Sequence, residues 1–283
     1  MEQEISPIID PANLISLSPS PGVVIIDART GANARANYDM QHLQGALFVD
    51  LDTNLANIKP GAADGGRHPL PHPAEFSALL GSLGITTESH VLVYDDKNGS
   101  NAAARFWWMM RSVGHKKVQV INGGLQAAIA AGFPLSAGTE DVLPLIDYGN
   151  VAWELPLTDI NEVEHASQDK NFTIIDVRDK ERFNGEKEPI DLVAGHIPNA
   201  MNIPLTQNLD KNGFFLPPGK LKALYTDALK DKDADKIIVH CGSGVTACHT
   251  ILAMAYAGMT MPKLYVGSWS EWSRNGKKIA TGL

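Results

Sequence analysis

A cysteine set between an apolar run and a glycine-containing loop is the residue best suited to nucleophilic chemistry. The run 236–239 leads through one histidine into Cys241, and the loop GSGVT at 242–246 precedes a stretch of helical character. Gly242 and Gly244 allow the backbone to turn sharply, so that successive N–H groups can surround the sulfur. The positive end of the following helix adds to that field. We expect Cys241 to react as a thiolate, and the same cradle suits the anionic outer sulfur of a cysteine persulfide.

The same loop permits two other interpretations of Cys241. A cysteine phosphatase places five residues between its cysteine and an arginine that grips phosphate through two hydrogen bonds. Here Ala247 follows the five residues 242–246, so the phosphate clamp is missing and this chemistry is excluded. The plain alternative is that Cys241 is a small buried hydrophobe. The flanking glycines and the place between strand and helix argue against it.

The second cysteine of the chain, Cys248, has no comparable setting. It lies among apolar residues of the helical stretch, so we expect it to pack in the core. A metal site could be drawn from Cys241, Cys248 and the adjacent histidines His240 and His249. Their spacing fits no common zinc pattern, and strand and helix would aim the four side chains apart. We therefore expect no metal site here.

The strands and helices that must position Cys241 recur in both halves of the chain. An apolar run that ends in Asp-x-Arg, a segment that begins with His, and an apolar run that ends at Asp or Cys follow one another twice. The matched segments are 23–29 with 172–178, 42–46 with 196–200, and 91–95 with 237–241. Because their order is kept while their spacing changes, we infer an internal repeat with loop insertions.

Each half alternates apolar runs with stretches of helical composition. Residues 102–113 and 246–257 are rich in Ala and contain, between them, Met, Leu and aromatic residues, and a glycine suited to a helix C-cap follows each. Continuous apolar strands separated by helices indicate a parallel sheet covered on both faces. We expect an α/β fold of two tandem domains, each a mostly parallel sheet with helices on both faces. The expected boundaries are a domain at 1–138, a linker at 139–156 and a second domain at 157–283.

Composition and charge exclude several classes of function. The chain has 283 residues, of which 44% are hydrophobic and 20% charged, an ordinary globular mixture. Its 24 basic and 32 acidic residues give a net charge of −8, and no basic block suits a nucleic acid or an anionic membrane surface. Two cysteines do not make a disulfide framework, the first ten residues lack a signal-peptide layout, and no apolar run approaches ~18 residues. We expect a cytoplasmic protein with no nucleic-acid or membrane partner.

Several motifs together resemble the rhodanese family. The likeness extends from about residue 23 to residue 272 and is carried by CGSGVTA at 241–247, DVR at 176–178, GHIPNA at 195–200 and GSWSEW at 267–272. A cysteine in the second domain alone resembles the two-domain sulfurtransferases of this family. The neutral Cys-Gly-Ser-Gly loop is similar to that of 3-mercaptopyruvate sulfurtransferases. Thiosulfate-using rhodaneses, by contrast, typically carry basic residues at the positions of Gly242 and Ser243. The resemblance implies two rhodanese-like domains, of which only the second is catalytic.

The two sulfur donors differ in charge, and this difference directs attention to two arginines. Thiosulfate is a compact dianion, whereas mercaptopyruvate is a monoanion whose carboxylate needs a clamp away from the sulfur. Arg178 follows its strand directly, and the resemblance implies the same substrate-binding role for it. Arg182, four residues on, could supply a second contact if that stretch starts a helix. Either could instead be a surface arginine paired with Asp179, Glu181 or Glu186.

The resemblance also implies a polar chain that handles protons. In the family, the residue at Ser243 is linked to an Asp and a His of the first domain, and the matching positions are Asp52 and His68. A hydroxyl held by a histidine could move a proton as a C–S bond breaks. The alternative is that Asp52 caps a turn and His68 lies in a polar loop, although the segment 61–66 has the composition of a loop able to reach a neighbouring domain. Arg105 matches a further family arginine that could face the cleft.

Three positions depart from the pattern of the family. Asp95 stands in the first half where Cys241 stands in the second, and a longer loop follows it, so we expect the first domain to be inactive and to supply one wall of the cleft. Val266 replaces the Asp that the family often has before Gly-Ser-Trp, which could alter loop packing. Gln44 replaces a usual proline.

The reaction implied by these residues is a double displacement. The Cys241 thiolate attacks the outer sulfur of a small-molecule donor, pyruvate leaves, and the persulfide passes its sulfur to a thiol such as that of thioredoxin or to cyanide. The substrate is expected to lie against Gly242, Gly244, Val245 and Thr246. No metal or organic cofactor is expected, because the persulfide carries the sulfur. The alternatives are a thiosulfate:cyanide sulfurtransferase and a non-catalytic rhodanese-like binding module.

Overall fold

The computed structural model describes residues 5–17, 20–141, 144–230 and 232–282. The chain divides into two compact units, each of which includes a segment from the other half of the sequence. The first unit comprises Met1–Asn57, Pro71–Glu154 and Lys211–Phe215, and the second comprises Ile58–Leu70, Leu155–Asp210 and Leu216–Leu283. The units therefore differ from the contiguous ranges 1–138 and 157–283, since residues 58–70 belong to the second unit.

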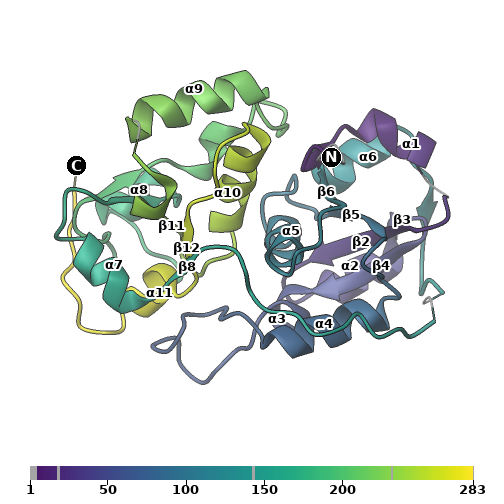
Figure 1. Cartoon of the computed structure of the whole chain (residues 1–283), viewed down its shortest axis with the longest axis horizontal. Helices are drawn as coiled ribbons and strands as arrows, with labels where there is room; N and C mark the ends of the chain where they lie inside the picture. Colours follow the sequence, from purple (N-terminus) through teal and green to yellow (C-terminus); the bar gives the residue numbers. More distant parts are fainter. Residues whose placement is uncertain (1–4, 18–19, 142–143, 231, 283) are drawn as a thin grey trace. The chain divides into compact units, whose positions relative to one another are not determined.

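A parallel sheet forms the centre of the first unit (Figure 1). In spatial order its strands are β1 (Ile8–Ile9), β6 (Val118–Ile121), β5 (His90–Tyr94), β2 (Val23–Arg29) and β4 (Ala46–Asp50). The helices are α1 (Leu14–Leu17), α2 (Ala34–Met40), α3 (Leu51–Asn54), α4 (Pro73–Ser82), α5 (Ala102–Ser112) and α6 (Gly124–Ala130), and β3 (His42–Leu43) pairs with β7 (Leu135–Ser136). Ile25 and Leu92 of the sheet share one core cluster with Leu14 of α1 and Leu125 of α6. Every residue of β5 after His90 is buried, as expected for a strand covered on both faces.

The second unit repeats this strand order. Its parallel strands are β8 (Leu157–Thr158), β12 (Lys263–Tyr265), β11 (Ile237–His240), β9 (Thr173–Asp176) and β10 (Ala200–Asn202). The helices are α7 (Ile160–Ala166), α8 (Lys180–Asn184), α9 (Pro218–Leu229), α10 (Ala247–Tyr256) and α11 (Ser268–Trp272). Ile174 and Ile238 of the sheet form a core cluster with Val163 of α7 and with Trp269 and Trp272 of α11. The expected fold of two α/β domains with mostly parallel sheets is confirmed.

Buried side-chain pairs are repeated in the two units as well. Arg29 donates from Nε and Nη2 to the Asp27 carboxylate at 2.8 Å each. Arg178 donates to Asp176 with the same two nitrogens, at 3.0 and 2.6 Å. Histidine rings also stack on aromatic rings at matched places, His42 on Tyr38 and His196 on Phe183. Because the first unit has no cysteine at the position of Cys241, these shared pairs belong to the architecture of the fold.

The segment expected as a linker packs against the first unit along part of its length. Ser77 Oγ donates to the Gly149 carbonyl at 2.6 Å, and the Ile146 N–H donates to the Gly81 carbonyl at 3.2 Å. Trp153 packs against the Phe76 ring, with 5.6 Å between ring centroids. Residues 142–143 of this segment lie outside the described residues. None of the helices in the described ranges is both long and apolar enough to cross a bilayer.

Candidate active site

Cys241 lies directly after β11 and is almost fully buried, with 2% of its surface exposed. Helix α11 holds the backbone around it. The Cys241 N–H donates to Ser268 Oγ at 3.2 Å, and the Trp269 N–H donates to the Cys241 carbonyl at 3.1 Å. On the strand side, the Nδ1 of His240 lies 3.1 Å from the same carbonyl, and complete burial lowers the pKa of this imidazole. The thiol is thus held in one position at the carboxyl end of the sheet.

The loop that follows turns around the sulfur. The Ser243 N–H donates to Cys241 Sγ at 3.4 Å. Helix α10 begins at Ala247, so its N-terminal end follows the loop directly. A backbone N–H beside the sulfur and the partial positive charge of a helix N-terminus both suit a negatively charged group at this place.

Gly244 is required for the course of this loop. Its φ is +72°, and a Cβ atom added to it would lie 2.5 Å from the Val266 carbonyl oxygen. Another residue would therefore combine backbone strain with a steric overlap. The contact is made by the carbonyl of Val266 and not by its side chain, so the replacement of the family Asp at this position leaves it unchanged. Val245, which is buried, and Thr246 complete the turn into α10.

Cys248 lies inside α10 and is completely buried, in agreement with the expectation that it packs in the core. Its Sγ donates to the Gly244 carbonyl at 3.3 Å. The neighbouring His249 is also completely buried, and burial lowers its pKa to about 3. Among the residues that the structure describes, no group of three or more His, Cys, Asp and Glu side chains is arranged to hold a metal ion.

Arg178 is committed to partners inside the chain. Its Nε and Nη2 bind Asp176, its Nη2 also donates to the Gly195 carbonyl at 2.7 Å, and its Nη1 lies 3.2 Å from Glu188. The guanidinium lies over the Trp269 ring, and 1% of the side chain is exposed. Burial disfavours its charge, but Asp176 outweighs burial, and the pKa of Arg178 is raised. Since each guanidinium nitrogen already has a partner and the first unit repeats the pair, the geometry favours a structural role, and substrate binding by Arg178 stays a prediction.

Arg182 lies closer to the loop and is less enclosed. The stretch 180–184 does form a helix, α8, and 13% of the Arg182 side chain is exposed. It donates to Glu188 at 2.7 Å and lies 3.4 Å from Asp191, so its partners are not the nearby acidic residues considered from the sequence. Both terminal nitrogens lie 3.6 Å from the place where a Cβ of Gly242 would be. Arg182 therefore faces the loop 242–246, and substrate binding by Arg182 stays a prediction.

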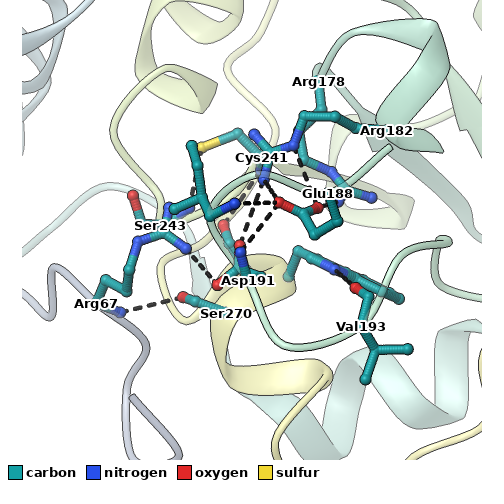
Figure 2. A network of polar contacts seen from close by, with 12 residues as sticks. Arg67, Arg178, Arg182, Glu188, Asp191, Val193, Cys241, Ser243 and Ser270 are labelled. Carbon is teal, nitrogen blue, oxygen red and sulfur yellow. Dashed lines mark hydrogen bonds and ion pairs between the residues drawn. The ribbon is translucent and has the colours of Figure 1, made fainter. Parts of the chain in front are cut away.

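A third arginine near the loop, Arg67, was not among the expected site residues. It comes from the segment 58–70, and its Nη1 forms an ion pair with the buried Asp191. Figure 2 shows the side chains of Arg67, Arg178 and Arg182 gathered around Cys241 and Ser243. A signal for it was present in the sequence, because Arg67 immediately precedes His68 at the end of a glycine-containing loop.

Two of the three residues of the expected relay are joined by a hydrogen bond. His68 Nδ1 and Ser243 Oγ lie 2.8 Å apart. Asp52 is an exposed residue of α3, and Arg105 is a completely buried residue of α5 whose Nη2 lies 3.4 Å from the Leu55 carbonyl. Both belong to the first unit, and their contributions to the site stay predictions.

In the first unit, Asp95 lies at the position that corresponds to Cys241, between a strand and the loop that leads into a helix. Its carboxylate accepts four backbone N–H groups, from Lys97 and Gly99 at 2.8 Å each, from Asn101 at 2.9 Å and from Ala103 at 3.2 Å. The carboxylate oxygens stand one bond beyond Cγ, as the outer sulfur of a cysteine persulfide stands one bond beyond Sγ. In this fold, the backbone N–H groups of the loop can therefore donate to an acceptor atom three bonds from Cα.

Comparison with known proteins supports the assignment to a family. The sequence matches the rhodanese-like domain twice, over residues 10–131 and 159–275. A probable 3-mercaptopyruvate sulfurtransferase of Pseudomonas aeruginosa is 39% identical over 270 residues, which cover 93% of each chain. A putative thiosulfate sulfurtransferase of Mycobacterium tuberculosis, SseB, is 38% identical over 264 residues, 89% of this chain and 88% of that one. The crystal structure of SseA from Escherichia coli, described as a 3-mercaptopyruvate sulfotransferase, matches with a TM-score of 0.78 and 32% identity, over 94% of this chain and 99% of that one.

The two sheets, the cysteine loop and these matches define the class of protein. The chain belongs to the rhodanese family and is an enzyme of the sulfurtransferase type. The relatives are named for two different sulfur donors, so the choice between donors depends on the site itself.

Proposed function

We propose that this protein transfers a sulfur atom from 3-mercaptopyruvate to a thiol or cyanide acceptor through a persulfide on Cys241, with release of pyruvate. One observation carries the proposal: Ser243 presents its N–H to Cys241 Sγ at 3.4 Å while its hydroxyl shares a 2.8 Å hydrogen bond with His68. We assign proton handling to Ser243 and His68, and these hydrogen bonds support the assignment. Mercaptopyruvate needs such a pair, because its leaving group is an enolate that must be protonated, whereas thiosulfate releases sulfite without a proton on carbon.

The first half-reaction balances without an outside reactant. The Cys241 thiolate attacks the sulfur of mercaptopyruvate, an S–S bond forms, and the C–S bond breaks with its electron pair moving to carbon. The proton that was on the donor sulfur then moves to the methylene carbon of the enolate, which becomes pyruvate. Ser243 and His68 are assigned to this transfer, and Asp52 is proposed to orient His68. The enzyme is left with an anionic outer sulfur on Cys241.

The persulfide is supported by the loop around it. The backbone N–H of Ser243 and the N-terminus of α10 favour negative charge at this place, and Asp95 in the first unit is the internal precedent for an acceptor group of the same reach. Gly242, Gly244, Val245 and Thr246 are assigned to its backbone cradle. In the second half-reaction an acceptor thiolate, such as that of thioredoxin, or cyanide attacks the outer sulfur, and Cys241 leaves as a thiolate.

The carboxylate of the donor is assigned to Arg182 in preference to Arg178. Arg182 faces Gly242 and is partly exposed, whereas the nitrogens of Arg178 are bound to Asp176, Glu188 and Gly195. Arg105 of the first unit stays a proposed contact with the substrate. No resident cofactor is needed in this scheme, because the persulfide carries the sulfur.

The proposal is tested by steady-state assays with both donors. We expect kcat/KM for mercaptopyruvate, measured by pyruvate release with a thiol acceptor, to exceed that for thiosulfate by at least tenfold. The thiosulfate:cyanide alternative has support in the relative SseB and predicts the reverse ratio. A non-catalytic binding module predicts no turnover of either donor. Either of these results would overturn the proposed function.

A further inference from the structure

Ser268 adopts a backbone conformation that serine rarely takes. Its φ is +52°, in the left-handed region that favours glycine, although it is the first residue of α11. Three other non-glycine residues of the described ranges have a positive φ, namely Asn98, Asn199 and Lys230. Two of these are asparagines, which tolerate this region, and Lys230 is exposed at the end of α9, whereas Ser268 is completely buried. A buried serine in this conformation indicates a use for its side chain that outweighs the strain.

Helices α6 and α11 occupy corresponding places in the repeat. Each begins shortly after the strand that precedes it, β6 in the first unit and β12 in the second. The second residue of each helix donates its N–H to the carbonyl of the residue that follows the neighbouring strand, β5 or β11. These bonds join Leu125 to Asp95 at 2.9 Å and Trp269 to Cys241 at 3.1 Å. The first residues of the two helices therefore occupy the same position of the fold.

Gly124 and Ser268 share this position but not its surroundings. Gly124 has a φ of +63°, and a Cβ atom added to it would lie 2.5 Å from the Asp95 carbonyl oxygen. The first unit thus leaves no room for a side chain here, and glycine adopts this backbone conformation without strain. The second unit accommodates a strained serine at the same position, and this is the unit that contains Cys241.

The hydroxyl of Ser268 connects Cys241 to the neighbouring strand. Its Oγ donates to the Tyr265 carbonyl at the end of β12 at 2.8 Å and accepts the Cys241 N–H at 3.2 Å. Because the donated bond fixes the hydroxyl proton, a lone pair of the oxygen is left for the Cys241 N–H. The Cys241 carbonyl is bound by the adjacent Trp269 N–H. The two peptide groups on either side of the Cys241 side chain are therefore both bonded to α11.

The direction of the Cys241 side chain depends on these two bonds. A rotation of the peptide before Cys241 would move Sγ relative to the Ser243 N–H, which lies 3.4 Å away. Without the hydroxyl of Ser268, the Cys241 N–H would be a buried donor that has lost its acceptor, and we expect the peptide to rotate. A displacement of about 1 Å at a reacting atom can lower a rate about a hundredfold.

We infer that Ser268 is a positioning residue for Cys241, because its hydroxyl fixes the peptide of the nucleophile and thereby the direction of the sulfur. The strained backbone of Ser268 is the consequence of placing a hydroxyl where the first unit has glycine. The inference rests on the proposed role of Cys241 as the nucleophile, but not on the identity of the donor. It therefore applies equally to transfer from mercaptopyruvate and from thiosulfate.

Ser268→Ala and Ser268→Gly together test this inference, because both remove the hydroxyl and only Ser268→Gly removes the strain. Sulfur uptake by Cys241 is measured in a single turnover without acceptor, as pyruvate or sulfite release at increasing donor concentration. We expect the rate constant at saturating donor to fall about tenfold to a hundredfold in both variants. The half-saturating donor concentration should stay within about threefold of wild type. Ser268→Gly should nevertheless unfold at a urea concentration about 0.5 M higher than Ser268→Ala.

A purely structural role of Ser268 predicts a different result. The rate constant would then follow stability, and Ser268→Gly would be faster than Ser268→Ala. Such a difference, or a wild-type rate constant in either variant, would overturn the inference. Equal unfolding midpoints of the two variants would also overturn it, because the strain that distinguishes Ser268 would be absent.

Lys230 provides a matched control for the effect of strain. Its φ is +48°, and it is an exposed residue at the end of α9. Lys230→Gly should likewise unfold at a higher urea concentration than Lys230→Ala, by about 0.5 M, while both keep the wild-type rate constant. A rate constant that differs between these two variants would mean that strain relief alone alters transfer, and would overturn the inference.

The site of sulfur addition distinguishes this inference from the proposed function. If the wild-type enzyme releases pyruvate or sulfite without adding sulfur to Cys241, the proposed function fails. If Cys241 acquires sulfur in the wild-type enzyme and does so at the same rate in Ser268→Ala, only the inference about Ser268 fails.

Discussion

Replacing Arg178 with methionine tests whether this arginine stabilises the fold or binds the sulfur donor. Methionine keeps much of the side-chain volume, but the completely buried Asp176 loses the guanidinium that binds both of its oxygens. Breaking a buried ion pair by removing one partner costs ~3–5 kcal/mol. With a urea dependence of about 2 kcal/mol per molar, the unfolding midpoint should fall by about 1.5–2.5 M at pH 7.

The pH dependence of this loss follows from the pKa of Asp176. Burial raises it, but His240 and Arg178 outweigh burial, and the pKa of Asp176 is lowered in the folded protein. A carboxyl group whose pKa is lowered by folding stabilises the folded protein at pH values above its unfolded pKa of about 3.9. This stabilisation is lost as the pH falls through the pKa of the folded state. In Arg178→Met the guanidinium no longer opposes burial, so protonation of Asp176 becomes easier. The difference between wild type and variant should therefore shrink as the pH is lowered from 7 towards about 4.

The assay is urea unfolding followed by circular dichroism, with Arg29→Met as the matched control. Arg29 and Asp27 form the corresponding pair in the first unit, so this variant should lose stability without a change in kcat/KM. For Arg178→Met we expect the loss of stability to dominate, with a KM for mercaptopyruvate within about threefold of wild type in the folded fraction. A KM raised tenfold or more together with an unchanged unfolding midpoint would refute the reasoning, because Arg178 would then be the carboxylate clamp.

Four further substitutions test other parts of the site. Ser243→Ala should lower kcat for mercaptopyruvate by about a hundredfold, because a positioned proton donor contributes at least that much. His68→Ala should lower kcat equally, and the double variant should show no further loss. Pyruvate release measures this, and additive losses would contradict a shared relay. Gly244→Ala should lower both the unfolding midpoint and kcat, because its Cβ would lie 2.5 Å from a backbone oxygen, and wild-type values of both would contradict the assigned geometry. Cys248→Ala should cost ~1–2 kcal/mol of stability through a small cavity and leave transfer intact, whereas lost transfer would show that this thiol takes part.

The elements that carry Cys241 could be predicted because local patterns decide them. The apolar run of β11, the glycines of the loop and the helical composition of 246–257 act over short distances, and α10 begins within one residue of the expected place. The repeat supplied the same information twice, since α5 and the expected helix 102–113 share their first residue. The parallel direction of the strands was predicted from this alternation of strands and helices, whereas their order in each sheet is known only from the structure.

The arginine network could not be predicted in the same way. The role of Arg178 depends on Asp176, two residues away, and the Asp-x-Arg repeated at Asp27 and Arg29 in the half without a cysteine was a signal for a structural pair. Arg67 reaches Gly242 through tertiary packing of the segment 58–70 on α11, which no local pattern encodes. Neutrality of the loop sequence was therefore an incomplete guide to the charge beside the sulfur.

Mass spectrometry of the donor-treated enzyme tests the central claim most directly. The wild-type protein is incubated with mercaptopyruvate without acceptor, digested, and examined for added sulfur while the released pyruvate is measured. We expect one added sulfur on the peptide that contains Cys241, in equal amount with pyruvate, loss of that sulfur on addition of a thiol or cyanide, and no modification in Cys241→Ser. Pyruvate release without sulfur on Cys241, or sulfur on Cys248 alone, would contradict the account.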